Sequence, residues 1–355
     1  MINGLVLLIE KKLPMLNFFT ALTLCPSDIR KIRRLLDMHR IDMNPLRHIL
    51  ITPLFASPES LKLVRNLKEH NGSTVMFDSG GYYVQVGKLT YQELYYPLLE
   101  FYKANPWADI YTLPDHVPTS QDSEQVVWQK IRDTADYTAL FYQEMPHHLQ
   151  SRALAVVQGH TYEQVDLCLK TYLQLGVQRI GFGSFGTIGK NNGINIATNS
   201  AVDLARYVVD IAHKNSVKVH FFGLGAPALI AMIYGAGADS FDSSAWIKSA
   251  GFGQVYLPFT RGYNISHRNG GSELQQGIQF KEFETLKILT GHSCPFCASI
   301  DELQAHKMHR ALHNLIAIQQ SVNMINSDAG DTIERIYRNG SPRYREEYQK
   351  WLNGI

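Results

Sequence analysis

The chain has 355 residues, 45% of them hydrophobic, so it can bury a large core as one large domain with an appendage or as two domains. Its formal charge of +2 excludes a strongly basic protein, but a polyanion needs only a local basic patch. Four cysteines in this length exclude a disulfide framework. The apolar run at 5–9 is too short to span a membrane and is followed at once by charged residues, so we expect a cytoplasmic protein.

Short apolar runs alternate with helix-like segments up to residue 244. Most runs are rich in Val, Ile, Phe or Tyr, and several are continuously apolar, as strands buried on both faces are. The predicted strands are 16–24, 48–54, 74–77, 109–113, 153–158, 179–183, 218–222 and 240–242. Predicted helices that follow cap-like Ser, Thr or Asp residues are 29–39, 60–67, 91–103 and 162–175. Eight strand–helix repeats predict an α/β protein with a (β/α)8 TIM barrel, and a doubly wound sheet is the alternative.

The alternation stops after residue 242. Residues 245–290 are rich in glycine and are predicted to form loops and short strands. A helix-like stretch follows from about 300 to 321, then a loop at 326–331 and two short helical segments. We therefore expect a barrel over 1–244, a loop region with a zinc-binding subdomain over 245–321, and C-terminal helices over 322–355 that pack on the barrel.

A cluster of metal-ligating residue types lies near position 300. His292, Cys294 and Cys297 are closely spaced, and thiolates with imidazoles at short spacing suit tetrahedral zinc. Four protein ligands would close the site and make the zinc structural. The alternative is two ordinary buried cysteines beside helix histidines. Three histidines of the next stretch compete as fourth ligand: His306, His309 and His313.

Carboxylates follow two of the predicted strands. Asp78 begins an Asp-Ser-Gly-Gly-Tyr segment after the third strand, and Asp242 ends the last one. Because the strand ends of a barrel converge on one pocket, such acids are candidate catalysts. Asp78 could instead close the strand with an Asx-turn. Asp239 rivals Asp242, but it starts the strand and faces the opposite side.

A glycine-rich segment follows the sixth strand. Gly181, Gly183 and Gly186 formally match a dinucleotide-binding pattern, but a loop follows where that pattern needs a helix. We therefore expect bare backbone to approach a flat ligand there. An unrelated barrel enzyme that binds phosphorylated substrates at the loop 181–193 is a further alternative.

Taken together, these segments resemble the tRNA-guanine transglycosylase family and its DNA-modifying relatives over about residues 50–320. The similar segments are DSGGY at 78–82, LPD at 113–115, VVQG at 156–159, GFG at 181–183, GLGAP at 223–227, GADSFDS at 237–243 and LHNL at 312–315. The last of these favours His313 as the fourth zinc ligand. The FDSSAW segment at 241–246 looks closer to the archaeal-type enzymes than to the bacterial ones.

Two departures from the family pattern bear on the substrate. His292 stands where the family usually has a first cysteine ligand, and imidazole can replace thiolate at zinc. The chain also ends soon after the barrel, without room for the RNA-binding domains that archaeal tRNA enzymes carry. It therefore looks most similar to the DNA 7-deazaguanine transglycosylases of the DpdA type, which exchange guanine in DNA for a base such as preQ0.

The resemblance implies a role for each site residue. Asp242 would be the nucleophile that forms a covalent glycosyl intermediate, and Asp78 would transfer protons. Asp115 would accept hydrogen bonds from the base, although it could simply cap the next helix. The remaining implied base-binding residues are Ser79, Tyr82 by stacking, Gln158, and the backbone of Gly181, Phe182 and Gly183. Gln158 could instead be a buried amide satisfied by neighbouring backbone.

The expected partners are DNA, or tRNA as the alternative, and a 7-deazaguanine base, with a homodimer or partner proteins possible and no membrane. Arg261 and Arg268 lie in a segment that resembles a basic loop of bacterial members, so we predict nucleic-acid contact there. They could be solvated charges, and the basic run 30–34 is the next candidate surface. A catalytically silent nucleic-acid-binding subunit is disfavoured because both acids are present.

Overall fold

The computed structural model describes residues 14–41, 43–119, 122–183, 199–265, 278, 280–328 and 330–339. Eight parallel strands form a closed barrel in which each strand pairs with the next and β8 pairs with β1. The strands are β1 (Asn17–Ala21), β2 (His48–Ile51), β3 (Thr74–Phe77), β4 (Ile110–Thr112), β5 (Ala153–Val157), β6 (Arg179–Phe182), β7 (Lys218–Phe221) and β8 (Ser240–Ser243). The predicted TIM barrel is confirmed, and closure between β1 and β8 excludes the doubly wound sheet.

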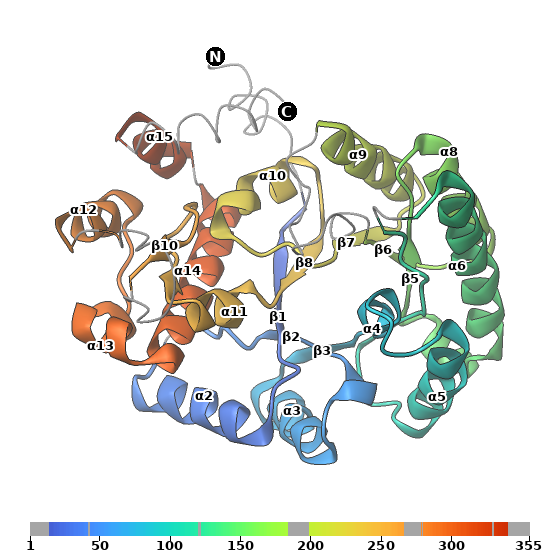
Figure 1. Cartoon of the computed structure of the whole chain (residues 1–355), viewed down its shortest axis with the longest axis horizontal. Helices are drawn as coiled ribbons and strands as arrows, with labels where there is room; N and C mark the ends of the chain where they lie inside the picture. The colour runs from blue at the N-terminus through green and yellow to red at the C-terminus, as the bar shows by residue number, and fades with distance from the viewer. Residues whose placement is uncertain are drawn as a thin grey trace.

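Helices surround the barrel, as Figure 1 shows. They are α2 (Pro26–Met38), α3 (Pro58–Asn71), α4 (Gly81–Gln85), α5 (Tyr91–Ala104), α6 (Glu124–Glu144), α7 (His147–Gln150), α8 (Tyr162–Gln174), α9 (Asn199–Lys214) and α10 (Ile230–Gly235). Side-chain caps start several of them: Ser57, Thr90, Ser123 and Thr161 each accept a backbone N–H bond from the first turn. None of the helices that the structure describes has the length and hydrophobicity that crossing a bilayer requires.

Alternation along the strands divides the buried side chains into two cores. The smaller core fills the barrel interior and consists of Phe19, Leu50, Met76, Leu154 and Val156. The larger core lies between the strands and the helices and takes the intervening strand positions. The five side chains of the smaller core fill the middle of the barrel. Inward-facing side chains that come after them, at the C-terminal ends of the strands, therefore point into the pocket at the barrel mouth.

The segment after β8 differs from the prediction of loops and short strands. α11 (Ala245–Gly251) and α12 (Phe280–Thr290) are helices, while β9 (Gln254–Val255) and β10 (Tyr263–Asn264) form a small antiparallel sheet. α11 has fewer than two turns and glycines end it, so its sequence carries little helical periodicity. Its buried Trp246 packs in the core, and tertiary packing against the next helices stabilises what its sequence does not predict.

The predicted helix from 300 to 321 is two helices, α13 (Ile300–Ala305) and α14 (Lys307–Ser327). The buried Arg310 donates to the carbonyls of Leu303 and Gln304, which satisfies the end of α13. α14 runs past the expected boundary at residue 321 and into the expected loop. α15 (Gly330–Asn339) then packs against α12; the second short helical segment lies outside the described residues.

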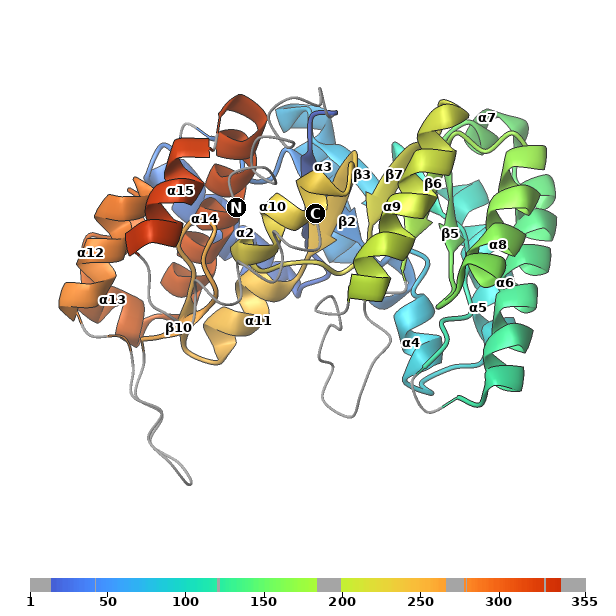
Figure 2. The ribbon, with the colours of Figure 1, turned by 90° about the horizontal axis from the view of Figure 1, so that it is seen from above.

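The helices α12 to α15 form a C-terminal module, and α14 joins this module to the barrel. The side chain of Asn326 accepts from the Leu16 N–H and donates to its carbonyl, both at 2.9 Å, at the start of β1. Earlier on the same helix, the buried Asn314 donates to the carbonyls of Trp246 and Gln254. Figure 2 shows α12 to α15 grouped at one side of the barrel, away from α6 and α8. The module is therefore docked against the start of β1 and against α11, the helix that follows β8.

Candidate active site and metal centre

Asp78 follows β3 at the mouth of the barrel and is partly buried. Its Oδ2 accepts hydrogen bonds from the Thr52 hydroxyl at 3.0 Å and from the Gly80 N–H at 3.3 Å. The second bond closes an Asx-turn, which is the alternative, structural role that the sequence indicates for Asp78. Desolvation, followed by the negative charge of Asp242, raises the pKa of Asp78 to about 7. The carboxyl group is thus poised to give or take a proton at neutral pH.

The two glycines after Asp78 turn the chain from β3 into α4. Gly80 has φ +87°, a region that favours glycine. A Cβ on Gly81 would lie 2.5 Å from Asp115 Oδ1, so glycine lets the two strand ends approach each other. Tyr82 follows and is 48% exposed, with its ring edge-to-face on Tyr83. An exposed aromatic ring beside the mouth suits the predicted stacking on a base.

Asp115 is buried after β4 and is held by two side chains. Its Oδ1 accepts from the Ser79 hydroxyl at 3.2 Å, and its Oδ2 accepts from Gln158 Nε2 at 2.6 Å. Desolvation raises the pKa of Asp115 to about 6, although these two hydrogen bonds oppose the rise. Asp115 does not cap the next helix, because Ser123 does so for α6. Held in this way, the carboxyl group can accept a hydrogen bond from a ligand.

The glycines at the end of β6 leave room for neighbouring side chains of the protein itself. A Cβ on Gly181 would lie 2.2 Å from the Phe222 ring, and one on Gly183 would lie 2.7 Å from Gln158 Nε2. Phe182 faces the other way and is buried between strands and helices, near Phe221. Only its backbone can contribute to the pocket. The rest of the loop, from residue 184 to 198, lies outside the described residues.

Asp242 is buried on β8, and one of its oxygens has two close polar neighbours. Its Oδ1 accepts from the Gly223 N–H at 2.9 Å and lies 3.4 Å from His220 Nε2. The Gly-Leu-Gly-Ala-Pro loop makes this possible: Gly223 has φ +72°, and a Cβ on Gly225 would lie 1.7 Å from Ser243 Oγ. The loop therefore covers the end of β8 at van der Waals distance.

Asp239 lies at the opposite end of the same strand. Its Oδ2 is 2.9 Å from His213 Nε2 and accepts from the Val219 N–H at 2.7 Å. It also lines a cavity of about 400 Å³ formed by residues at the N-terminal ends of the strands. These contacts give Asp239 a structural role away from the barrel mouth, as the argument from strand direction predicts.

The structure brings Asp78, Asp115 and Asp242 together, since the charges of the latter two both raise the pKa of Asp78. Sequence reasoning missed two side chains of this cluster, Thr52 and His220. Thr52 directly follows β2, so the strand-end rule that selects Asp78 could have found it. His220 lies on β7 two residues before Phe222, on the inward-facing set, but its contact with Asp242 depends on the register between β7 and β8.

The predicted nucleic-acid contacts are only partly described. The Arg261 guanidinium lies over the Tyr263 ring, 5.7 Å from its centroid, and no acceptor is recorded for its buried Nε among the described residues. Arg268 lies outside the described residues.

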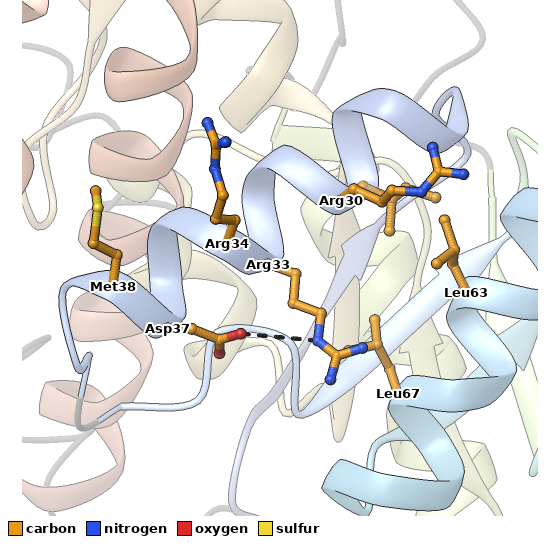
Figure 3. A pocket seen from close by; sticks show the side chains of 8 residues that line it. Arg30, Arg33, Arg34, Asp37, Met38, Leu63 and Leu67 are labelled. Carbon is orange, nitrogen blue, oxygen red and sulfur yellow. Dashed lines mark ion pairs between the residues drawn. The ribbon is translucent and has the colours of Figure 1, made fainter.

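The basic run on α2 lines a groove of about 560 Å³ against α3 (Figure 3). Arg30 pairs with Glu59 on α3, and Arg33 lies 3.9 Å from Asp37. Arg34 points to another side of the helix in Figure 3 and is exposed, and no ion pair is recorded for it within the described part of the chain. Because both ion pairs are solvent-exposed and therefore weak, this surface can still attract an anion.

The four predicted metal ligands lie within 4.8 Å of one another. His313 Nδ1 is 3.3 Å from His292 Nε2 and 3.3 Å from Cys294 Sγ, and the two sulfurs are 3.5 Å apart. Ligand atoms of a tetrahedral zinc, bonded at about 2.0–2.3 Å, are about 3.3–3.8 Å apart. The group could therefore hold a metal such as zinc. His306 and His309 lie instead beside Glu302.

The other ring nitrogens of both histidines are occupied, as in metal sites with fixed imidazoles. His292 Nδ1 is 2.8 Å from Gln320 Oε1, and His313 Nε2 is 2.7 Å from the Tyr256 carbonyl. Burial lowers the pKa of His313, which keeps its imidazole neutral and able to bind a metal. The Tyr256 N–H donates to the side chain of Asn314, the residue that follows His313. His313 and Asn314 therefore both bind the backbone of Tyr256.

With this geometry in place, comparison with known proteins identifies the family. Residues 103–327 match the family model described as queuine tRNA-ribosyltransferase. The match covers more than half of the chain, from α5 to the end of α14, so the protein belongs to the tRNA-guanine transglycosylase family, whose members exchange guanine in nucleic acid. It includes Asp115, Asp242 and the His–Cys cluster but begins after Asp78. Among curated proteins, no match was found.

We expect purified protein to contain about one zinc per chain, held by His292, Cys294, Cys297 and His313. His313→Ala should lose the metal, because three protein ligands no longer close the tetrahedral site. It should also lower the thermal midpoint, because folding then no longer gains the free energy of metal binding. His309→Ala, on the same helix but outside the cluster, is the matched control and should keep the metal. Metal analysis and thermal unfolding provide the measurements, and full zinc content in His313→Ala would contradict the assignment.

Proposed function

We propose that this protein exchanges guanine in DNA for a 7-deazaguanine base such as preQ0, through a covalent intermediate on Asp242. The observation that carries the proposal is the cluster of three carboxyl groups at the barrel mouth. Each has different surroundings, which is how one pocket can combine a nucleophile, an acid and a hydrogen-bond acceptor. Membership of the family supports the reaction type.

In the first step, the Asp242 carboxylate forms a bond to C1′ of the nucleotide while the glycosidic C–N bond breaks. The electron pair of that bond leaves with guanine, which takes a proton from Asp78. A carboxyl group with a pKa of about 7 holds this proton in a useful fraction of molecules at neutral pH. The product is a glycosyl ester on Asp242, as in a retaining glycosidase.

In the second step, the incoming base attacks C1′ and releases Asp242. Its N–H proton passes to the now ionised Asp78, which restores the starting state of the enzyme. Asp115 accepts from the N–H edge of either base, and Gln158 and Ser79 hold its carboxylate in place. Both bases must enter the same site, so the outgoing guanine leaves before the replacement binds.

The polynucleotide must present a base outside the stack, because a paired base inside a duplex cannot reach a pocket at the barrel mouth. The likeness of Phe241–Trp246 to archaeal-type enzymes supports the proposal of DNA as the substrate. The second candidate is the same exchange on tRNA, which the description of the matching family names. In either case the zinc-type cluster supports the fold and does not take part in the reaction.

Incubating the protein with labelled preQ0 and either duplex DNA or bulk tRNA tests the polymer. We expect label in DNA. Label only in tRNA would overturn the DNA proposal and leave the exchange reaction standing, whereas label in neither would contradict both candidates.

Asp242→Asn should abolish the covalent adduct between protein and nucleic acid, a fall of at least about 10³-fold, because an amide cannot form the ester. The adduct can be trapped by denaturing the mixture in the absence of an incoming base. Asp239→Asn, on the same strand but at the other end of the barrel, is the control and should still form adduct. An adduct with Asp242→Asn would make Asp78 the next candidate nucleophile.

Adduct formation should slow as pH rises through about 7. The pKa of Asp78 is raised, so its proton is present below that value and is lost above it, and the first step consumes this proton. The rate should fall about tenfold per pH unit above pH 7. Single-turnover rates between about pH 6 and pH 8.5 measure this. Asp78→Asn should be slow at every pH, and a rate that rises with pH would assign Asp78 as a base in this step.

Arg261→Ala and the double variant Arg33→Ala/Arg34→Ala should each weaken DNA binding and reduce its salt dependence, by up to about one unit of slope for each phosphate that the variant no longer binds. Arg132→Ala is the control, because Arg132 is an exposed residue of α6. Figure 1 shows α6 across the barrel from α2. Binding titrations at several salt concentrations measure the slopes. A variant whose slope equals that of wild type does not remove a phosphate contact.

A further inference from the structure

We propose that His220 is a positioning residue that holds Asp242 by Oδ1 and thereby leaves Oδ2 to attack the sugar. The inference rests on the proposed function and adds to it a residue and an atom. The contacts of His220 carry it, because they distinguish one oxygen of the nucleophile from the other.

The position of His220 follows from the pairing of β7 with β8. His220 pairs with Ser240 in the strand register, and Ser240 and Asp242 lie on the same face of β8. The imidazole is 2% exposed and reaches both residues: Nδ1 lies 2.8 Å from Ser240 Oγ, and Nε2 lies 3.4 Å from Asp242 Oδ1. The rings of Phe19 and Phe222 lie edge-on to it and fix its orientation.

The two contacts select one tautomer of the ring. A carboxylate oxygen can only accept, so Nε2 must carry a hydrogen to form a favourable contact with Asp242. In a neutral ring, Nδ1 is then the acceptor, and the Ser240 hydroxyl can donate to it. The opposite tautomer would direct a nitrogen lone pair at the carboxylate. The geometry therefore favours a chain in which Ser240 donates to His220 and His220 donates to Asp242.

This chain makes the two oxygens of Asp242 unequal. Oδ1 has two neighbouring donors, the His220 ring and the Gly223 N–H at 2.9 Å. No hydrogen bond to Oδ2 is recorded among the described residues. Donors lower the nucleophilicity of the oxygen they bind and fix the plane of the carboxylate, so Oδ2 keeps the more reactive lone pairs and a defined direction.

His220 also separates Asp242 from the cavity at the N-terminal end of the barrel, which its ring lines. Truncation to alanine would open that space, so variants of similar size give a cleaner test. Glutamine can place an amide N–H close to the position of Nε2, whereas leucine fills the space without a donor. Comparison of the two separates the hydrogen bond from the packing.

In single-turnover assays, His220→Leu should form the Asp242 adduct about 10- to 100-fold more slowly than wild type, because the carboxylate loses the contact that fixes its plane and directs Oδ2 at the sugar. His220→Gln should recover most of that loss. The concentration of nucleic acid that half-saturates the reaction should not change, because the ring does not contact the polymer. His48→Leu is the matched control: His48 is another histidine of the barrel interior, and its contacts do not include Asp242.

The proposal is overturned if His220→Leu reacts at the wild-type rate, or if Gln and Leu slow the reaction equally while thermal unfolding stays at the wild-type midpoint. A second readout does not depend on the reaction. Nitrogen NMR of histidine-labelled protein, with the His220 signals assigned by their loss in His220→Gln, should show the proton on Nε2. A proton on Nδ1 alone overturns the proposal, whereas absence of any wild-type adduct would count against the proposed function instead.

Discussion

The site depends on one constraint, the enclosure of three carboxyl groups at the mouth of a closed parallel barrel. Charges that share a low-dielectric space repel, and the protein accommodates them by giving each a different environment. Asp115 and Asp242 are held by hydrogen-bond donors, while Asp78 has its pKa raised to about 7. The same enclosure that makes these groups costly to bury raises the pKa of Asp78 toward neutral pH.

Close approach of backbone to side chain is what makes this enclosure possible. Gly81 admits the Asp115 carboxylate, and Gly183 admits the Gln158 amide that binds it. Gly225 has no side chain and so leaves room for the Ser243 side chain, and the loop after β7 can therefore direct the Gly223 N–H at Asp242. Each of these glycines is explained by a close neighbour within the protein itself.

The C-terminal module supports the strand that carries Asp242. The His–Cys cluster fixes His313 on α14, and His313 and Asn314 together bind both polar groups of Tyr256. Tyr256 lies shortly after α11, which follows β8 directly. At the other end of α14, Asn326 binds Leu16 at the start of β1. A metal in the cluster would therefore stabilise the seam at which β1 and β8 close the barrel, some distance from the reacting groups.

The strand positions were predictable because buried parallel strands read as short apolar runs, whichever strands they pair with. For the same reason, the acids at their ends, Asp78 and Asp242, could be picked out from the sequence alone. Three members of the metal-ligand set, His292, Cys294 and Cys297, were also readable, since the chemistry of thiolates and imidazoles at short spacing is local. The choice of His313 as the fourth member came from the family resemblance. Helix α11 was not, because its few residues become helical only by packing against the module.

Tertiary structure decided which candidates meet and through which atoms. Only the register of β7 against β8 places His220 beside Asp242, and only the fold of the glycine loop brings the Gly223 N–H to the same oxygen. It also showed that the side chain of Phe182 faces the helices. Sequence determines which groups are available and on which strand they lie. Distances between strands, and with them the pKa of Asp78 and the partners of each oxygen, arise only when the barrel closes.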